Sequence, residues 1–219
     1  MTDKPRLPSD THHVAIAGRT GSGKTVAALE MLSKRDFTKQ AWIIVDHKGD
    51  DNIAKLPAER LAVNSRFLPQ SGLHIVRPTI AKASREALDD LLTKIREKGN
   101  IGVYIDEGHL VGASEPLRHL LVAGRQHKTP VMFTSQRAAH IDTFVWSQAS
   151  FYRVFALQTA ADIKRFNENF PIKFRNLPEF HSHYYDVAKG KIFHLSASQP
   201  LSATLQTFDN KLLHAYRMI

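Results

Sequence analysis

The sequence predicts an α/β fold with a mainly parallel central sheet flanked by helices. Short, continuously apolar runs alternate with segments of helical periodicity, as is typical of strands buried on both faces of a parallel sheet. The 219 residues suffice for one such domain with a substantial core, and are too few for two large ones. We expect a single domain over residues 1–219, with a core over about 12–170 and a C-terminal extension over about 171–219.

Five apolar runs predict the buried strands, at residues 14–17, 41–45, 73–76, 101–105 and 131–134. Between the third and fourth runs, residues 81–97 place apolar side chains at helical spacing, and Gly99 ends the predicted helix. Another helix is expected over 115–127, before Pro130. Ligands of such a sheet bind at the carboxyl ends of its strands.

The pattern changes after residue 150. Residues 151–157 predict a further strand, and residues 160–169 predict a helix that begins near Thr159. Two short segments, 184–187 and 191–195, flank Ala188-Lys189-Gly190 and predict a β-hairpin with a glycine in its turn. The final twenty or so residues are only weakly patterned.

A glycine-rich segment follows the first predicted strand. Residues 18–25 read GRTGSGKT, a complete GxxxxGK[ST] phosphate-binding loop (Walker A), and the helix-forming run 26–32 follows it. Glycines let backbone N–H groups turn toward a phosphate, and the helix presents its positive end to the anion. We expect nucleotide contacts from Gly18, Thr20, Gly21, Ser22, Gly23, Lys24 and Thr25. A glycine-rich turn with an incidental lysine is the alternative, but the flanking strand and helix argue against it.

The residues at the end of this loop predict the cofactors ATP and Mg²⁺. Lys24 is expected to reach the β- and γ-phosphates, and the Thr25 hydroxyl to ligate Mg²⁺. The strand predicted at 101–105 ends in two adjacent carboxylates (Walker B), of which Asp106 is the expected metal partner and Glu107 the residue that polarises the attacking water. An exposed acidic turn is the alternative. An acid directly after the metal-binding aspartate favours hydrolysis over transfer to a small-molecule acceptor.

A polar amide follows the strand predicted at 131–134. Gln136 is positioned to hydrogen-bond both the attacking water and the γ-phosphate, and so to sense the state of the nucleotide. A capping glutamine is the alternative interpretation. Together these residues predict an ATPase whose catalytic residues are Lys24, Glu107, Gln136 and a further arginine.

Five short segments, in order, resemble the FtsK/HerA superfamily of DNA-pumping ATPases. Besides the phosphate-binding loop, they read DHKGD at 46–50, DEGH at 106–109, GRQ at 124–126 followed by TSQR at 134–137, and SQA at 147–149. Ser150 stands where the family has aspartate. The resemblance implies a RecA-like P-loop NTPase of the additional-strand type that works as a ring, pentameric or hexameric, with nucleotide at the subunit boundary.

The resemblance also implies an arginine that acts on the nucleotide of a neighbouring subunit. Arg125 matches it, and Arg137 and Arg153 are competing candidates. A guanidinium on the developing γ-phosphate charge accelerates hydrolysis by orders of magnitude. For Asp46 and Lys48 the residues alone leave a structural ion pair between them as an equal interpretation.

Size and motifs most resemble the genome-packaging ATPases of icosahedral viruses with an internal membrane and double-jelly-roll capsids. The first predicted strand begins near residue 14, so we expect a bare motor with no transmembrane segment or N-terminal barrel. The resemblance implies that it pumps DNA into a preformed capsid, in the host cytoplasm and at the packaging vertex of the virion, with a capsid or vertex protein as partner. A small plasmid or conjugation pump is one alternative, and a nucleotide-dependent assembly or scaffold factor is another.

Composition agrees with a polyanionic partner and limits other chemistry. Lys and Arg number 30 against 21 Asp and Glu, giving a net charge of +9, which favours contacts with the DNA phosphate backbone without sequence specificity. Basic candidates for these contacts are Lys164, Arg165, Lys173, Arg175, Lys189 and Lys191. Absence of cysteine excludes disulfides, thiol catalysis and cysteine-based zinc sites. The twelve histidines lack metal-ligand spacing and are interpreted as scattered polar or core residues.

Overall fold

The computed structural model describes residues 4–217, which form one mixed sheet with helices on both faces. The strands are β1 (Val14–Ala17), β2 (Ala41–Asp46), β3 (Glu59–Arg60), β4 (Leu73–Val76), β5 (Ile101–Asp106), β6 (Val131–Ser135), β7 (Phe151–Val154), β8 (Ser182–Asp186) and β9 (Lys191–Leu195). Their order across the sheet is β3-β4-β2-β5-β6-β1-β7-β8-β9. Strands β1 to β7 pair in parallel, and the β8–β9 hairpin continues the sheet antiparallel to β7.

The order of the central strands confirms the additional-strand topology. Strand β6 lies between β1, which precedes the phosphate-binding loop, and β5, which ends in the acidic pair. In register, Ala17 pairs with Ser135, and Ile105 pairs with Phe133. Three successive strand ends therefore bring the glycine-rich loop, the polar end of β6 and the two carboxylates to one edge of the sheet.

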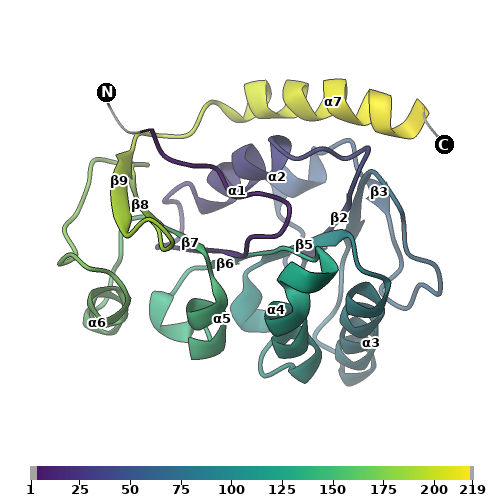
Figure 1. The fold of residues 1–219 in the computed structure, drawn as a ribbon, viewed down its shortest axis with the longest axis horizontal. Coiled ribbons are helices and arrows are strands. Elements are labelled where there is room, and N and C mark those ends of the chain that lie inside the picture. Colours follow the sequence, from purple (N-terminus) through teal and green to yellow (C-terminus); the bar gives the residue numbers. More distant parts are fainter. Residues whose placement is uncertain (1–3, 218–219) are drawn as a thin grey trace.

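Helices cover both faces of the sheet (Figure 1). They are α1 (Lys24–Ser33), α2 (Asp51–Ala54), α3 (Lys82–Lys98), α4 (Glu115–His127), α5 (Thr143–Gln148), α6 (Ala160–Asn169) and α7 (Leu201–Arg217), with short 3₁₀ turns η1 (Gly108–Leu110) and η2 (Ala138–His140). In Figure 1, α1, α2 and α7 lie on one face, and α3 to α6 lie on the other. No helix within residues 4–217 has the length and apolar character needed to span a membrane.

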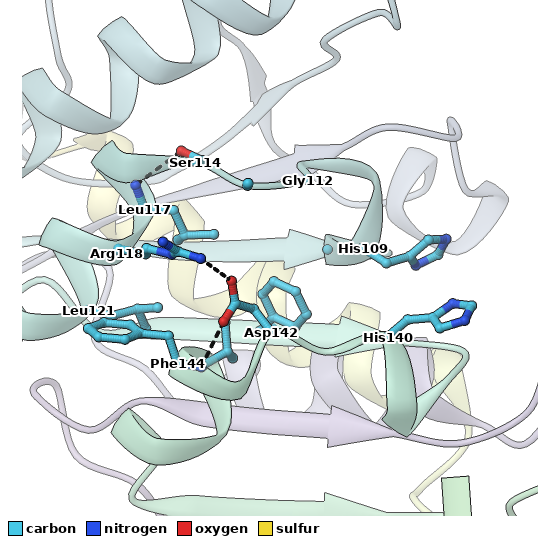
Figure 2. A pocket seen from close by; sticks show the side chains of 13 residues that line it. His109, Gly112, Ser114, Leu117, Arg118, Leu121, His140, Asp142 and Phe144 are labelled. Atoms are coloured by element: carbon cyan, nitrogen blue, oxygen red, sulfur yellow. Dashed lines mark hydrogen bonds and ion pairs between the residues drawn. The ribbon is translucent and has the colours of Figure 1, made fainter. Parts of the chain in front are cut away.

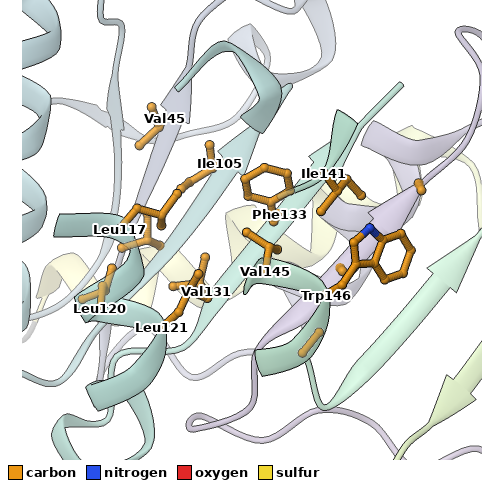
Figure 3. Packing of buried hydrophobic residues seen from close by; sticks show 14 of the residues in the cluster. Val45, Ile105, Leu117, Leu120, Leu121, Val131, Phe133, Ile141, Val145 and Trp146 are labelled. Carbon is orange, nitrogen blue, oxygen red and sulfur yellow. The ribbon is translucent and has the colours of Figure 1, made fainter. Parts of the chain in front are cut away.

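Each face of the sheet packs its own apolar layer. Figure 3 shows the layer beneath α4 and α5, where Leu117 and Leu121 lie near Ile105 and Val131 of the sheet. Phe133 in the same layer is only 3% exposed and fills the space beneath Gly108, where a Cβ would come 2.2 Å from its ring. The strands are therefore buried on both sides, as their continuous apolar runs predicted.

Several predicted elements are confirmed with shifted ends. Strand β7 stops at Val154, three residues before the expected end, opposite Ala17, where its partner β1 also ends. The hairpin strand β8 begins two residues early, at Ser182. Helix α6 begins just after Thr159, as predicted, and Thr159 caps it by accepting from the Asp162 N–H. The C-terminus is the 17-residue helix α7. Its apolar side chains recur at helical spacing, with Phe208, Leu212 and Ala215 buried and Leu201 and Leu205 partly buried against the same layer. The expectation of a weakly patterned C-terminus is therefore wrong.

Candidate active site

The phosphate-binding loop is anchored to the strands on both sides of β1. The Gly18 N–H donates to Ser135 O at 3.3 Å, and the Arg19 N–H donates to Ala156 O at 2.8 Å. A Cβ at Gly18 would lie 2.6 Å from the Phe155 Cβ, so only glycine fits against this strand. Gly23, at φ 94°, precedes α1 without a side-chain cap. The first N–H groups of the helix are therefore left for an anion.

Lys24 is held in place by contacts within the chain. Its side chain is buried, and Nζ donates to Arg19 O at 3.0 Å. Burial lowers the pKa of Lys24, while the carboxylates of Glu107 and Asp106 oppose that shift. A phosphate placed against Nζ would favour the charged form further. The geometry suits the predicted contact with the β- and γ-phosphates.

Asp106 ends β5 in an almost fully buried position. The Tyr104 hydroxyl donates to Oδ1 at 2.7 Å, and the Thr134 hydroxyl donates to the same oxygen at 2.8 Å. Burial raises the pKa of Asp106 above its usual value. Both bonds fall on Oδ1, which orients the carboxylate with Oδ2 free of them. A carboxylate fixed in this way has the kind of oxygen that Mg²⁺ prefers as a ligand.

Glu107 is fixed by a chain of polar contacts that reaches back to the phosphate-binding loop. Its Oε1 accepts from Lys48 Nζ at 3.0 Å and from Gln136 Nε2 at 2.6 Å. Gln136 Oε1 in turn accepts from the Thr20 hydroxyl at 2.9 Å. Glu107 also has a left-handed backbone, with φ at 50°, a conformation that costs free energy and recurs at functional sites. Gln136 therefore links the loop directly to the carboxylate.

Lys48 is the residue of this network that the sequence left undecided. It pairs with Glu107 and not with Asp46. Asp46 instead accepts from its own following turn, at Gly49 N and Asp50 N, and pairs with Arg77 at 2.9 Å. The structural pairing of Asp46 with Lys48 is therefore wrong. The only sequence signal for Lys48 was its place in the DHKGD segment.

The three candidate arginines differ in where they lie. Arg125 is exposed at the C-terminal end of α4, and its Nη2 donates to Ser150 Oγ at 2.8 Å, at the edge of the sheet opposite the phosphate-binding loop. Arg137 pairs with Asp162 at 2.8 Å. Arg153 is 4% exposed and donates to Ser182 and Ser198, so it has no free path to a neighbouring molecule.

A cavity of about 220 Å³ lies behind the turn that carries Glu107. Figure 2 shows His109 and His140 together at one end of it, with Arg118 bound to Asp142 toward the other end at 3.0 Å. The His109 Nδ1 lies 3.4 Å from Glu107 Oε2, and burial lowers the pKa of His109. The η1 turn after Glu107 therefore faces open space on the α4 side.

Comparisons with known proteins agree with this geometry. The chain is 33% identical over 217 residues to the DNA packaging ATPase P9 of Enterobacteria phage PRD1, covering 93% of this chain and 95% of that protein. Residues 6–55 match the family described as the Type IV secretion-system coupling protein DNA-binding domain. Among solved structures, the genome packaging NTPase B204 of Sulfolobus turreted icosahedral virus 2, in complex with ATP-gammaS, is similar with a TM-score of 0.70 at 17% identity, covering 88% of this chain and 100% of that one. EssC (ATPases 2 and 3) of Geobacillus thermodenitrificans has a TM-score of 0.67 at 10% identity, covering 95% of this chain and 45% of that one.

Proposed function

This chain belongs to the family of viral DNA packaging ATPases, and we propose that it hydrolyses ATP to pump viral DNA into a preformed capsid. The observation that carries the proposal is the match to a packaging ATPase at 33% identity over 93% of the chain. The match to coupling-protein domains covers only residues 6–55, so the conjugation-type pump is the weaker alternative.

Each residue of the site has its own role in hydrolysis. Lys24 and the N-terminus of α1 bind the β- and γ-phosphates, and Gln136 spans from the Thr20 hydroxyl to Glu107. Glu107 orients and polarises the attacking water beside the γ-phosphate. Thr25 and Asp106 would hold Mg²⁺, which neutralises charge on the phosphates when it is bound. A water held by Glu107 would then be aligned with the phosphate that Lys24 holds.

A neighbouring subunit completes the site. Arg125 lies at the sheet edge opposite its own phosphate-binding loop, since it bonds Ser150 just before β7 begins. It is therefore too remote to serve the nucleotide of its own chain, and its exposure lets it enter the site of an adjacent subunit. In a ring of subunits, each Arg125 would lie far from the nucleotide of its own chain and face the nucleotide of the adjacent subunit.

DNA is the substrate on which the motor acts, through contacts to the phosphate backbone. The excess of nine positive charges supplies the electrostatic attraction. The motor works in the host cytoplasm and at the packaging vertex, where it docks on a capsid or vertex protein. An assembly factor without motor activity would hydrolyse ATP at the same rate with and without DNA.

The direct test of this function is the Lys24→Ala variant in a packaging assay. Loss of Nζ removes the contact with the β- and γ-phosphates, so hydrolysis and DNA packaging should both stop while empty particles still assemble. Lys34→Ala is the matched control, because Lys34 is an exposed lysine just past the other end of α1, and it should package normally. DNA-filled particles from the Lys24→Ala variant would contradict the proposal.

A further inference from the structure

A pocket beside the phosphate-binding loop has no role in the hydrolysis steps described above. On the β7 side of the loop lies an open pocket of about 640 Å³. It is lined by Arg19, Gly21 and Ser22 of the loop, by residues 156–158 after β7, and by residues 176–181. The Arg19 N–H bond to Ala156 O joins the loop directly to this wall.

The strand order fixes which end of a nucleotide reaches this pocket. The residues that act on the γ-phosphate follow β5 and β6, on one side of β1, and β7 lies on the other side. Glu107 and Gln136 are bonded to each other on the γ-phosphate side. A triphosphate laid along the loop with its γ-phosphate toward them directs its nucleoside toward β7.

Phe180 is the notable side chain of the pocket. It has a left-handed backbone, with φ at 60°, a conformation that bulky residues rarely adopt. Its ring approaches the phosphate-binding loop, because a Cβ built on Gly23 would lie 3.3 Å from the Phe180 Cδ1. Even so, 44% of its surface remains exposed. A large aromatic ring that stays half-exposed beside the loop, on a strained backbone, indicates a binding role.

The rest of the pocket suits a purine nucleoside. Leu157, Leu177 and Pro178 supply apolar surface, and the exposed amides of Gln158 and Asn176 can each donate and accept hydrogen bonds. An amide of this kind can pair with both the amino group and a ring nitrogen of adenine. Most of these residues belong to the segment 176–181, outside the segments that match the superfamily.

We propose that this pocket binds the adenosine of ATP and that the Phe180 ring stacks on the adenine. The proposal rests on the ATPase function above and adds the residues that hold the base. Stacking of a base on an aromatic side chain is worth about tenfold in affinity or somewhat more. Phe180 thus sets affinity for the nucleotide without taking part in phosphate chemistry.

The test compares two ligands by isothermal titration calorimetry on the full chain, ATP and inorganic tripolyphosphate, each with Mg²⁺. Phe180→Ala should raise the Kd for ATP by about tenfold and leave the Kd for tripolyphosphate unchanged, since the latter has no base. Phe180→Tyr should keep the wild-type Kd for ATP. Phe67→Ala is the matched control, because Phe67 is an 85% exposed phenylalanine in the loop between β3 and β4, and it should change neither Kd.

Other results overturn the proposal in distinguishable ways. An unchanged Kd for ATP in Phe180→Ala would mean that the base binds elsewhere, while the ATPase function stands. Equal loss of ATP and tripolyphosphate affinity would mean that Phe180 only supports the shape of the loop. Failure of the wild-type chain to bind either ligand would remove the ATPase proposal together with this one.

Discussion

The two sides of the phosphate-binding loop are built on different principles. On the β6 side, buried or half-buried charges and amides form a continuous chain through Gln136, Glu107 and Lys48, with distances between 2.6 and 3.0 Å. On the β7 side, a half-exposed aromatic ring and a few amides line an open pocket. Rigid polar geometry suits a reaction, whereas an open pocket with an aromatic ring and exposed amides suits ligand binding. Changes on the first side should alter turnover, and changes on the second should alter binding.

The largest expected effect on hydrolysis comes from Arg125, which we propose acts on the nucleotide of a neighbouring subunit. Arg125→Ala should lower hydrolysis by about 10³-fold in the assembled ring, because the γ-phosphate charge of the neighbour loses its guanidinium. Nucleotide binding by the isolated subunit should be unchanged. ATPase rate against protein concentration measures this, with exposed Arg66→Ala as the control. Equal rates for Arg125→Ala and wild type in the ring would transfer the role to another arginine.

Replacing Glu107, on the β6 side of the loop, should have the next largest effect on the rate of ATP hydrolysis. Glu107→Gln keeps the size of the side chain but removes the carboxylate, so ATP hydrolysis should fall by at least about 10²-fold while the Kd for ATP stays close to wild type. Glu97→Gln, on the exposed end of α3, is the control. Turnover near the wild-type rate would remove Glu107 from the water-activating role.

The smallest expected effect concerns stability and comes from His13, which lies away from both sides of the loop. His13 lies just before β1, at the edge opposite the nucleotide, where its Nδ1 accepts from Val131 N at 2.9 Å and burial lowers its pKa to about 4. The unfolded chain takes up the His13 proton near pH 6.5 and the folded chain only near pH 4. Stability should therefore fall as the pH drops between these values.

Urea unfolding measures the contribution of His13. The wild-type chain should lose about 2 kcal/mol from this residue between about pH 7 and about pH 5. His13→Asn, which keeps an acceptor for Val131 N, should show a flatter dependence. Exposed His127→Asn is the control and should follow wild type. If the His13→Asn curve coincides with wild type, the buried neutral histidine is not the source of acid sensitivity.

The sequence predicted the β6 side of the site better than the β7 side, for a physical reason. Asp106 ends a strand of the parallel sheet, and Lys24, Glu107 and Gln136 follow such strands, so the topology alone brings these four residues to one edge. Phe180 lies in an irregular segment after α6 with no periodicity to reveal it. The pairing of Lys48 with Glu107 depends on how the turn after β2 folds, which no local pattern indicates. Helix α7 carries an amphipathic pattern at helical spacing, so its apolar face could have been predicted from the sequence.

The most direct test of the division between the two sides is a parallel determination of kcat and KM for ATP in Glu107→Gln and Phe180→Ala, with DNA present. We expect Glu107→Gln to lower kcat at nearly constant KM, and Phe180→Ala to raise KM at nearly constant kcat. If both variants change the same parameter, either kcat or KM, the proposed division between the two sides of the loop is wrong.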